Sequence, residues 1–187
     1  MIHKLPDKKY DIIMADPAWD YFSRWKRVNS DSSGGWGWAR DHYNEMNSDD
    51  IKKLPVNKIS NDNSFLFMWA TFPQIQLALD VIREWGFEYK TVAFTWIKKN
   101  KNGKNFMGMG WYTRANAEVC LLAKKGKPKV LDHSVKQVIE SVREKHSKKP
   151  DEVRDRIVRL CGDLPRIELF AREKVDGWDS WGLEVSD

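Results

Sequence analysis

The chain has 187 residues, of which 41% are hydrophobic, and carries a formal net charge of +5. This length is typical of one domain, no apolar run approaches the roughly 20 residues of a membrane-spanning helix, and the N-terminal residues lack the apolar stretch of a signal peptide. Two isolated cysteines, Cys120 and Cys161, form neither a disulfide framework nor a metal-binding set. We therefore expect one domain over residues 1–187, located in the cytoplasm, without membrane contact and without a bound metal.

The basic residues are clustered, and their distribution favours an anionic partner. One cluster lies at 24–40, a second at 98–114 and a third at 124–129, and we expect each to fall in a loop rather than along a helix. Three tryptophans lie within the first of these segments, and flat aromatic rings beside Lys and Arg are typical of proteins that bind nucleic acid. Solubilising charge with incidental aromatics remains the alternative.

The first half of the chain alternates between apolar runs and polar breaks. Residues 11–15 predict a strand, which ends in Asp16-Pro17-Ala18-Trp19 and is followed by a long irregular segment. The polar residues 48–50 are suited to cap a short helix, and the apolar run 64–70 predicts a buried strand. The apolar residues of 73–85 roughly fit a helical face, and the next residue, a glycine, ends that helix.

The second half continues the same alternation. We expect strands at 89–97, 117–124, 137–142 and 166–172, and a helix from residue 150 to 160. Such alternation favours a three-layer α/β fold with a largely parallel sheet. In these folds the ligand binds outside the carboxyl ends of the strands. The segment after the first strand therefore lies where chemistry is expected.

An Asp-Pro pair at that place can act on a flat, exocyclic aromatic amine. The nitrogen lone pair of such an amine is delocalised into the ring, so alkylation needs acceptors for both N–H hydrogens. The Asp16 carboxylate and the Pro17 carbonyl offer two acceptors, Pro17 stiffens the backbone, and Trp19 can stack on a purine. The alternative is a simple turn followed by a core tryptophan.

The residues "ADPAW" resemble the Asp-Pro-Pro-Trp signature of the adenine-N6 methyltransferases, the family that includes the catalytic subunit of the eukaryotic messenger-RNA adenosine methyltransferase. The resemblance continues in order through "HYNEM", "FLFMWA", "WGFEYKTVAFTWIKK", "GWYTRANAEVCLLAKKGKP", "HSKKPDE", "RIELFAR" and "GWDSWG". It covers about residues 10 to 184, and the chain looks like the compact bacterial and phage members. It implies a Rossmann-like class I methyltransferase fold, with the catalytic motif before the cofactor-binding strand, and S-adenosyl-L-methionine as cofactor.

The resemblance and the basic, aromatic loops together indicate site residues. The catalytic motif is Asp16, Pro17, Ala18 and Trp19. The residues expected to bind the cofactor are Asp16, His146, Lys149, Glu168, Phe170 and Arg172. The residues expected to bind the substrate are Tyr43 and Glu118, which match the family's base pocket, and four residues of the basic, aromatic loops: Tyr21, Arg24, Trp25 and Lys98. A purely structural role is open for Tyr43 and Glu118, and a loop histidine that shapes the cofactor pocket is the simpler reading of His146.

Three departures from the family pattern limit what the resemblance implies. Ala18 replaces the second proline of the signature, which removes some rigidity but keeps the Pro17 carbonyl. Leu183 stands where the family often has an asparagine, so a polar contact to the cofactor is absent or supplied elsewhere. An upstream acidic strand that contacts the cofactor's adenine in the eukaryotic relatives has no counterpart here.

We therefore expect methyl transfer from S-adenosyl-L-methionine to the N6 amine of adenine in nucleic acid, with DNA favoured because the chain looks like compact members without an RNA-binding domain. Two alternatives stay open: the same chemistry on RNA, and a catalytically inactive subunit that only binds nucleic acid. A homodimer and a heterodimer are both compatible with the sequence. A basic binding domain without enzymatic activity leaves the motif unexplained.

Overall fold

A computed structural model describes residues 4–19, 46–108, 110, 112–144 and 148–185 of the chain. Its centre is a seven-stranded sheet with the strand order β5-β3-β4-β2-β1-β6-β7. The strands are β1 Tyr10–Ala15, β2 Ser60–Ala70, β3 Glu88–Lys99, β4 Ala117–Lys125, β5 Val138–Val142, β6 Arg166–Leu169 and β7 Asp179–Trp181. The helices are α2 Ser48–Lys53, α3 Val56–Ile59, the 3₁₀ turn η1 Phe72–Gln74, α4 Ile75–Glu84 and α5 Glu152–Cys161. None of these described helices is long and apolar enough to cross a membrane.

The sheet is mixed but mostly parallel, as expected for the Rossmann-like fold. Strand β1 pairs in parallel with β2 on one side and with β6 on the other, and β3 and β5 are also parallel. Strand β4 alone among the described strands runs the other way, antiparallel to both β2 and β3. The amino end of β4 therefore lies at the same edge of the sheet as the carboxyl ends of its neighbours.

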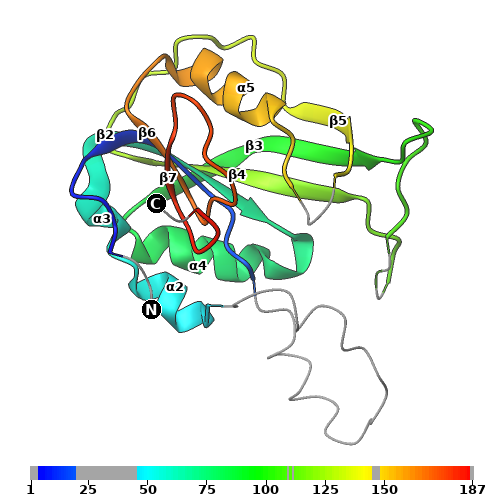
Figure 1. Cartoon of the computed structure of the whole chain (residues 1–187), viewed down its shortest axis with the longest axis horizontal. Helices are drawn as coiled ribbons and strands as arrows, with labels where there is room; N and C mark the ends of the chain where they lie inside the picture. The colour runs from blue at the N-terminus through cyan, green and yellow to red at the C-terminus, as the bar shows by residue number, and fades with distance from the viewer. Residues whose placement is uncertain (1–3, 20–45, 109, 111, 145–147, 186–187) are drawn as a thin grey trace, which may run out of the picture.

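Helices cover both faces of the sheet, which gives the three expected layers (Figure 1). Because alternate residues of a strand point to opposite faces, β1 contributes Ile13 to one core and Ile12 and Met14 to the other. The first core includes apolar residues of α2 and α4, and the second includes Val153 and Ile157 of α5. The sheet thus has a buried core on each face, which leaves the ends of its strands accessible for a functional site.

Several predicted boundaries differ from the observed ones. The cap of α2 is Asn47, whose side chain accepts from the backbone N–H of Asp49 at 3.1 Å, rather than the polar residues 48–50. The last predicted strand stops at residue 169, because Phe170 adopts a left-handed backbone with φ of 63° that cannot continue a strand. The basic clusters were expected in loops, but the residue pairs 98–99 and 124–125 are the last residues of β3 and β4.

Candidate active site

The carboxyl edge of the sheet brings together predicted site residues that are far apart in the sequence. Asp16 directly follows β1, Lys98 lies at the end of β3, and Glu168 lies in β6. Glu118 comes to this edge because β4 is reversed, and its register partner on β3 is Trp96. Lys149 lies in the segment between β5 and α5. The parallel topology with one reversed strand therefore assembles the site.

Four of these side chains form a row of alternating charge. The Lys149 ammonium nitrogen lies 2.7 Å from Oδ2 of Asp16 and 3.4 Å from Oε2 of Glu118. The Lys98 ammonium donates a hydrogen bond to Oε1 of Glu118. The side chains of Asp16, Glu118 and Lys149 are at most 20% exposed, so water screens these interactions weakly. Lys149 is thus the bridge between the predicted catalytic motif and the predicted substrate residues.

The Glu118 carboxylate and the Lys149 ammonium favour each other's charged form. Burial alone would raise the pKa of Glu118, but the ammonium groups of Lys149 and Lys98 outweigh burial and hold that pKa below its usual range. Burial alone would lower the pKa of Lys149, but the Asp16 and Glu118 carboxylates outweigh it and raise that pKa. The Asp16 carboxylate therefore lies against a permanent cation.

Trp19 anchors the predicted catalytic motif to the neighbouring strand β2. Its indole Nε1 donates a hydrogen bond of 3.0 Å to the carbonyl oxygen of Trp69, near the end of β2, and only 7% of the residue is exposed. Trp69 in turn lies under the Lys149 ammonium, which is 5.5 Å from the ring centroid. Trp19 is therefore a buried anchor in this structure, and its stacking on a purine stays a prediction.

The end of β6 holds a second acidic group beside the motif. Glu168 accepts a hydrogen bond of 2.8 Å from Nε of Arg154 on α5, through its Oε2 atom. Burial raises the pKa of Glu168, and the Arg154 contact opposes that rise. Phe170 follows with its left-handed backbone and packs edge-on against Trp181 at a centroid distance of 5.5 Å. Arg172 lies 3.9 Å from a carboxylate oxygen of Glu184.

The edge has polar groups that suit a zwitterionic, ribose-bearing cofactor such as S-adenosyl-L-methionine. Asp16 and Lys149 offer opposite charges to the amino-acid part, and Oε1 of Glu168 accepts no hydrogen bond within the described residues. Nε1 of Trp69 and Oγ1 of Thr71 are buried and lack partners within the same residues. Leaving buried polar atoms without hydrogen-bond partners is energetically costly. A ligand bound at this edge can pair with these atoms and remove that cost. The residues present therefore fit the cofactor.

Sequence reasoning missed part of this arrangement. Arg154, which orients Glu168, and the partnerless atoms of Trp69 and Thr71 were not predicted. The spacing of Asp151 and Arg154, three residues apart at the start of a helix, indicates a local ion pair, and these side chains lie 2.7 Å apart. No comparable signal links Arg154 to a strand residue 14 positions later.

The structure places only some of the predicted residues. Pro17 is buried and Ala18 is partly exposed, next to Asp16. Five predicted site residues lie outside the described residues, and their roles remain predictions: Tyr21, Arg24, Trp25, Tyr43 and His146.

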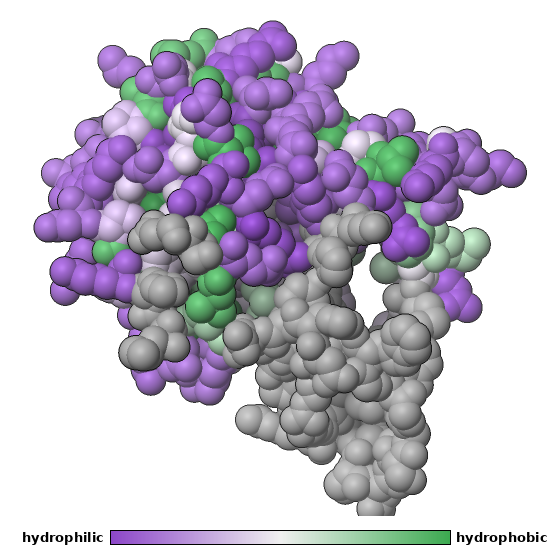
Figure 2. Space-filling view, in the orientation of Figure 1, coloured by the Kyte–Doolittle hydropathy of each residue, from purple (hydrophilic) through white to green (hydrophobic). Residues whose placement is uncertain are grey.

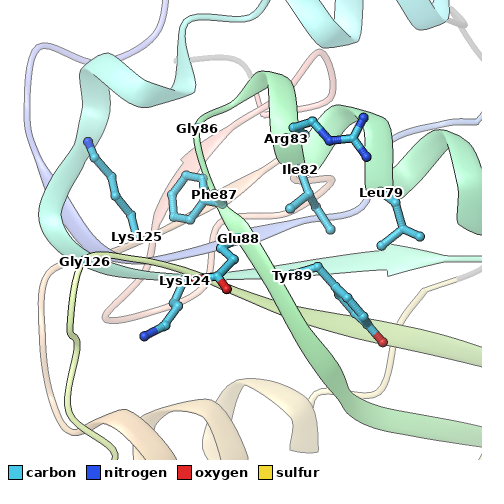
Figure 3. A pocket seen from close by; sticks show the side chains of 10 residues that line it. All are labelled: Leu79, Ile82, Arg83, Gly86, Phe87, Glu88, Tyr89, Lys124, Lys125 and Gly126. Carbon is cyan, nitrogen blue, oxygen red and sulfur yellow. The ribbon is translucent and has the colours of Figure 1, made fainter.

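A hollow of about 550 Å³ lies at the other edge of the sheet and contains none of the predicted site residues. It is lined by Arg83 and the end of α4, by Tyr89 at the start of β3, and by Lys124 at the end of β4 (Figure 3). Seven residue steps of β4 separate Glu118 from Lys125, or about 23 Å of extended strand. The hollow is therefore remote from the acidic and basic row described above.

Comparison with known proteins matches nearly the whole chain to one family. The family model described as MT-A70 matches residues 10–184. The Type II methyltransferase M.MunI from Mycoplasma sp is 39% identical, over 98% of this chain and 81% of that protein. The N(6)-adenosine-methyltransferase catalytic subunit METTL3 from Homo sapiens is 27% identical over 88% of this chain, and a putative MT-A70-like N(6)-adenosine-methyltransferase from Medicago truncatula is 28% identical over 95%. The chain spans only about a quarter of the length of these two eukaryotic relatives, 26% and 27%.

Proposed function

Because this chain belongs to the MT-A70 family and is an S-adenosylmethionine-dependent adenine-N6 methyltransferase, we propose that its substrate is DNA. The relative with the Type II methyltransferase name is more similar to this chain than the eukaryotic adenosine methyltransferases are, and it is of comparable length. The charge of the chain suits any nucleic acid, so the higher identity to the Type II methyltransferase decides between the two substrates.

The observation that carries the catalytic assignment is the position of Asp16. Its carboxylate follows β1 at the carboxyl edge and lies 2.7 Å from the Lys149 ammonium. The cofactor supplies an electrophilic methyl group when it is bound. Asp16 and the Pro17 carbonyl accept the two N–H hydrogens of the adenine amine, which favours a pyramidal nitrogen whose lone pair is available for attack.

The neighbouring residues keep this acceptor pair in place. Trp19 ties the motif to β2 through its hydrogen bond to Trp69, and Lys149 fixes the position of the Asp16 carboxylate through their ion pair. The amine nitrogen becomes acidic once it is alkylated, so its proton can leave without a strong base. Ala18 does not remove either acceptor, since the second one is a backbone carbonyl of Pro17.

The substrate proposal is tested by transfer of radiolabelled methyl groups from S-adenosyl-L-methionine to unmethylated genomic DNA and to total RNA in parallel. We expect label in DNA and little in RNA. Label in RNA alone would keep the chemistry and refute the substrate. If calorimetry shows that the protein binds the cofactor but neither nucleic acid is labelled, the result would instead favour an inactive partner subunit. This alternative is motivated by the absence of the second signature proline, which is Ala18 here.

A further inference from the structure

A hairpin arm, described at residues 99–108, 110 and 112–116, extends beyond the sheet where β3 ends and β4 begins (Figure 1). We propose that this arm opens duplex DNA: its basic residues bind the backbone, and Tyr112 enters the base stack in the place of the adenine that rotates into the active site. This inference rests on the proposed function and names its substrate class as double-stranded DNA.

The root of the arm is built by backbone hydrogen bonds. Phe106 donates its N–H to the carbonyl of Lys98 at 2.8 Å, and Gly108 donates to the carbonyl of Ala115 at 2.8 Å. A Cβ atom on Gly108 would lie 2.5 Å from that carbonyl oxygen, so the two sides of the arm are in direct contact. The Arg143 guanidinium lies 4.1 Å from the Phe106 ring centroid and fixes the arm to the end of β5. The arm therefore has a defined platform.

The root of this arm is connected to the charged row of the candidate site. Lys98, at the root, hydrogen-bonds Glu118 of the charged row and donates its backbone N–H to the carbonyl of Asn116 at 2.9 Å. Tyr112 is three residues from Ala115, and three residues of extended chain span at most about 10 Å. A side chain at this position can reach a base stack whose target nucleotide has entered the site.

The charge of the arm matches a polyanion. Residues 98–116 contain five basic residues and no aspartate or glutamate. Lys101, Lys104 and Arg114 are exposed and form no ion pair within the described part of the chain. Figure 2 shows hydrophilic side chains with hydrophobic ones among them on the part of the molecule that projects toward the right. Cations without protein partners are available to phosphate groups.

Tyr112 is a large aromatic side chain that the arm leaves exposed to solvent. It is fully exposed, and Met107 on the same arm is 70% exposed. Rotating a base out of a duplex leaves a gap and costs unstacking energy, and inserted side chains fill such gaps in other DNA-binding proteins. Tyr89 is a natural control, because it is another exposed tyrosine but lines the remote hollow (Figure 3).

The test compares methylation rates on one preparation of unmethylated genomic DNA, either as sheared duplex or after heat denaturation to single strands. We expect Tyr112→Ala to slow methylation of the duplex by at least about tenfold, equivalent to 1.36 kcal/mol in the barrier. We expect it to change methylation of the denatured DNA by less than about twofold, because a single strand needs no opening. Tyr112→Trp should restore the duplex rate, and Tyr89→Ala should leave both rates unchanged.

The outcomes separate this inference from the proposed function. An equal loss on both DNA forms, or no loss on either, would overturn the role of Tyr112 while leaving the DNA methyltransferase in place. Wild-type protein that methylates only denatured DNA would also overturn it. Wild-type protein that methylates neither form would overturn the proposed function and the inference together. Because Tyr112 is fully exposed, the variants should fold normally, and circular dichroism checks this.

Discussion

Replacing Lys149 by methionine should remove the cation that holds Asp16 and Glu118 at the catalytic edge. At an effective dielectric constant of about 20, unit charges at 2.7 Å and 3.4 Å attract by roughly 6 and 5 kcal/mol. Desolvation of the buried ions offsets much of this attraction, and removing one partner of a buried pair typically costs about 3–5 kcal/mol. We expect a loss of that size in the free energy of unfolding, with loss of cofactor binding.

The loss should depend on pH in a defined direction. The lowered pKa of Glu118 gives stability that is present above the ordinary value of 4.5 and lost as pH falls through the folded pKa. The raised pKa of Lys149 gives stability that is present below 10.5 and lost as pH rises through the folded pKa. Without the Lys149 ammonium, burial should raise the Glu118 pKa, because only Lys98 remains to oppose it. The deficit of Lys149→Met should therefore shrink as pH falls from 8 to 5.

Urea unfolding of the wild type, Lys149→Met and the matched control Lys148→Met measures this. Lys148 also has acidic neighbours, but its side chain is 31% exposed and its partners Asp151 and Glu173 are largely exposed. Its replacement should cost less than about 1 kcal/mol. Combining Lys149→Met with Glu118→Gln should recover part of the loss, because the second change removes an unpaired buried charge. Equal costs for the two lysine variants would refute this electrostatic role.

Two further changes test the anchors around the motif. Trp19→Phe removes a buried hydrogen bond to β2, so it should lower the free energy of unfolding by about 1–2 kcal/mol. It should also slow methylation while cofactor binding persists. Unchanged urea unfolding would contradict this role of Trp19. Arg154→Met removes the donor to Glu168, so the pKa of that acid should rise further above its usual range. Cofactor affinity measured by calorimetry should then fall more steeply between pH 8 and pH 6 than in the wild type, whereas parallel pH profiles would show that Glu168 does not contact the cofactor.

The sequence predicted the motif's position because its signals are local. An apolar run that ends in Asp16-Pro17 indicates both the strand and its end, and the observed β1 confirms the strand. The early end of β6 was not predictable, because Phe170 is an ordinary strand residue by propensity and its left-handed backbone depends on tertiary contacts.

The ion pairs of the charged row could not be predicted from short stretches of the sequence. Lys98 and Glu118 meet because β3 and β4 pair antiparallel with Trp96 opposite Glu118, and strand direction cannot be recognised in an apolar run. Lys149 and Asp16 are 133 residues apart and meet through the order of the strands in the sheet. Family resemblance named Asp16, Glu118 and Lys149, and the basic segment named Lys98, but neither showed that one lysine joins the two acids.

The most direct test of the assignment is mass spectrometry of nucleosides from unmethylated duplex DNA treated with the protein and S-adenosyl-L-methionine. We expect N6-methyladenine with the wild type and none with Asp16→Asn, a nearly isosteric change that removes the charged acceptor at the end of β1. Calorimetry on the same two proteins shows whether cofactor binding survives the change. A methylated base other than N6-methyladenine, or undiminished N6-methyladenine with Asp16→Asn, would contradict Asp16 as the residue that binds the reacting amine.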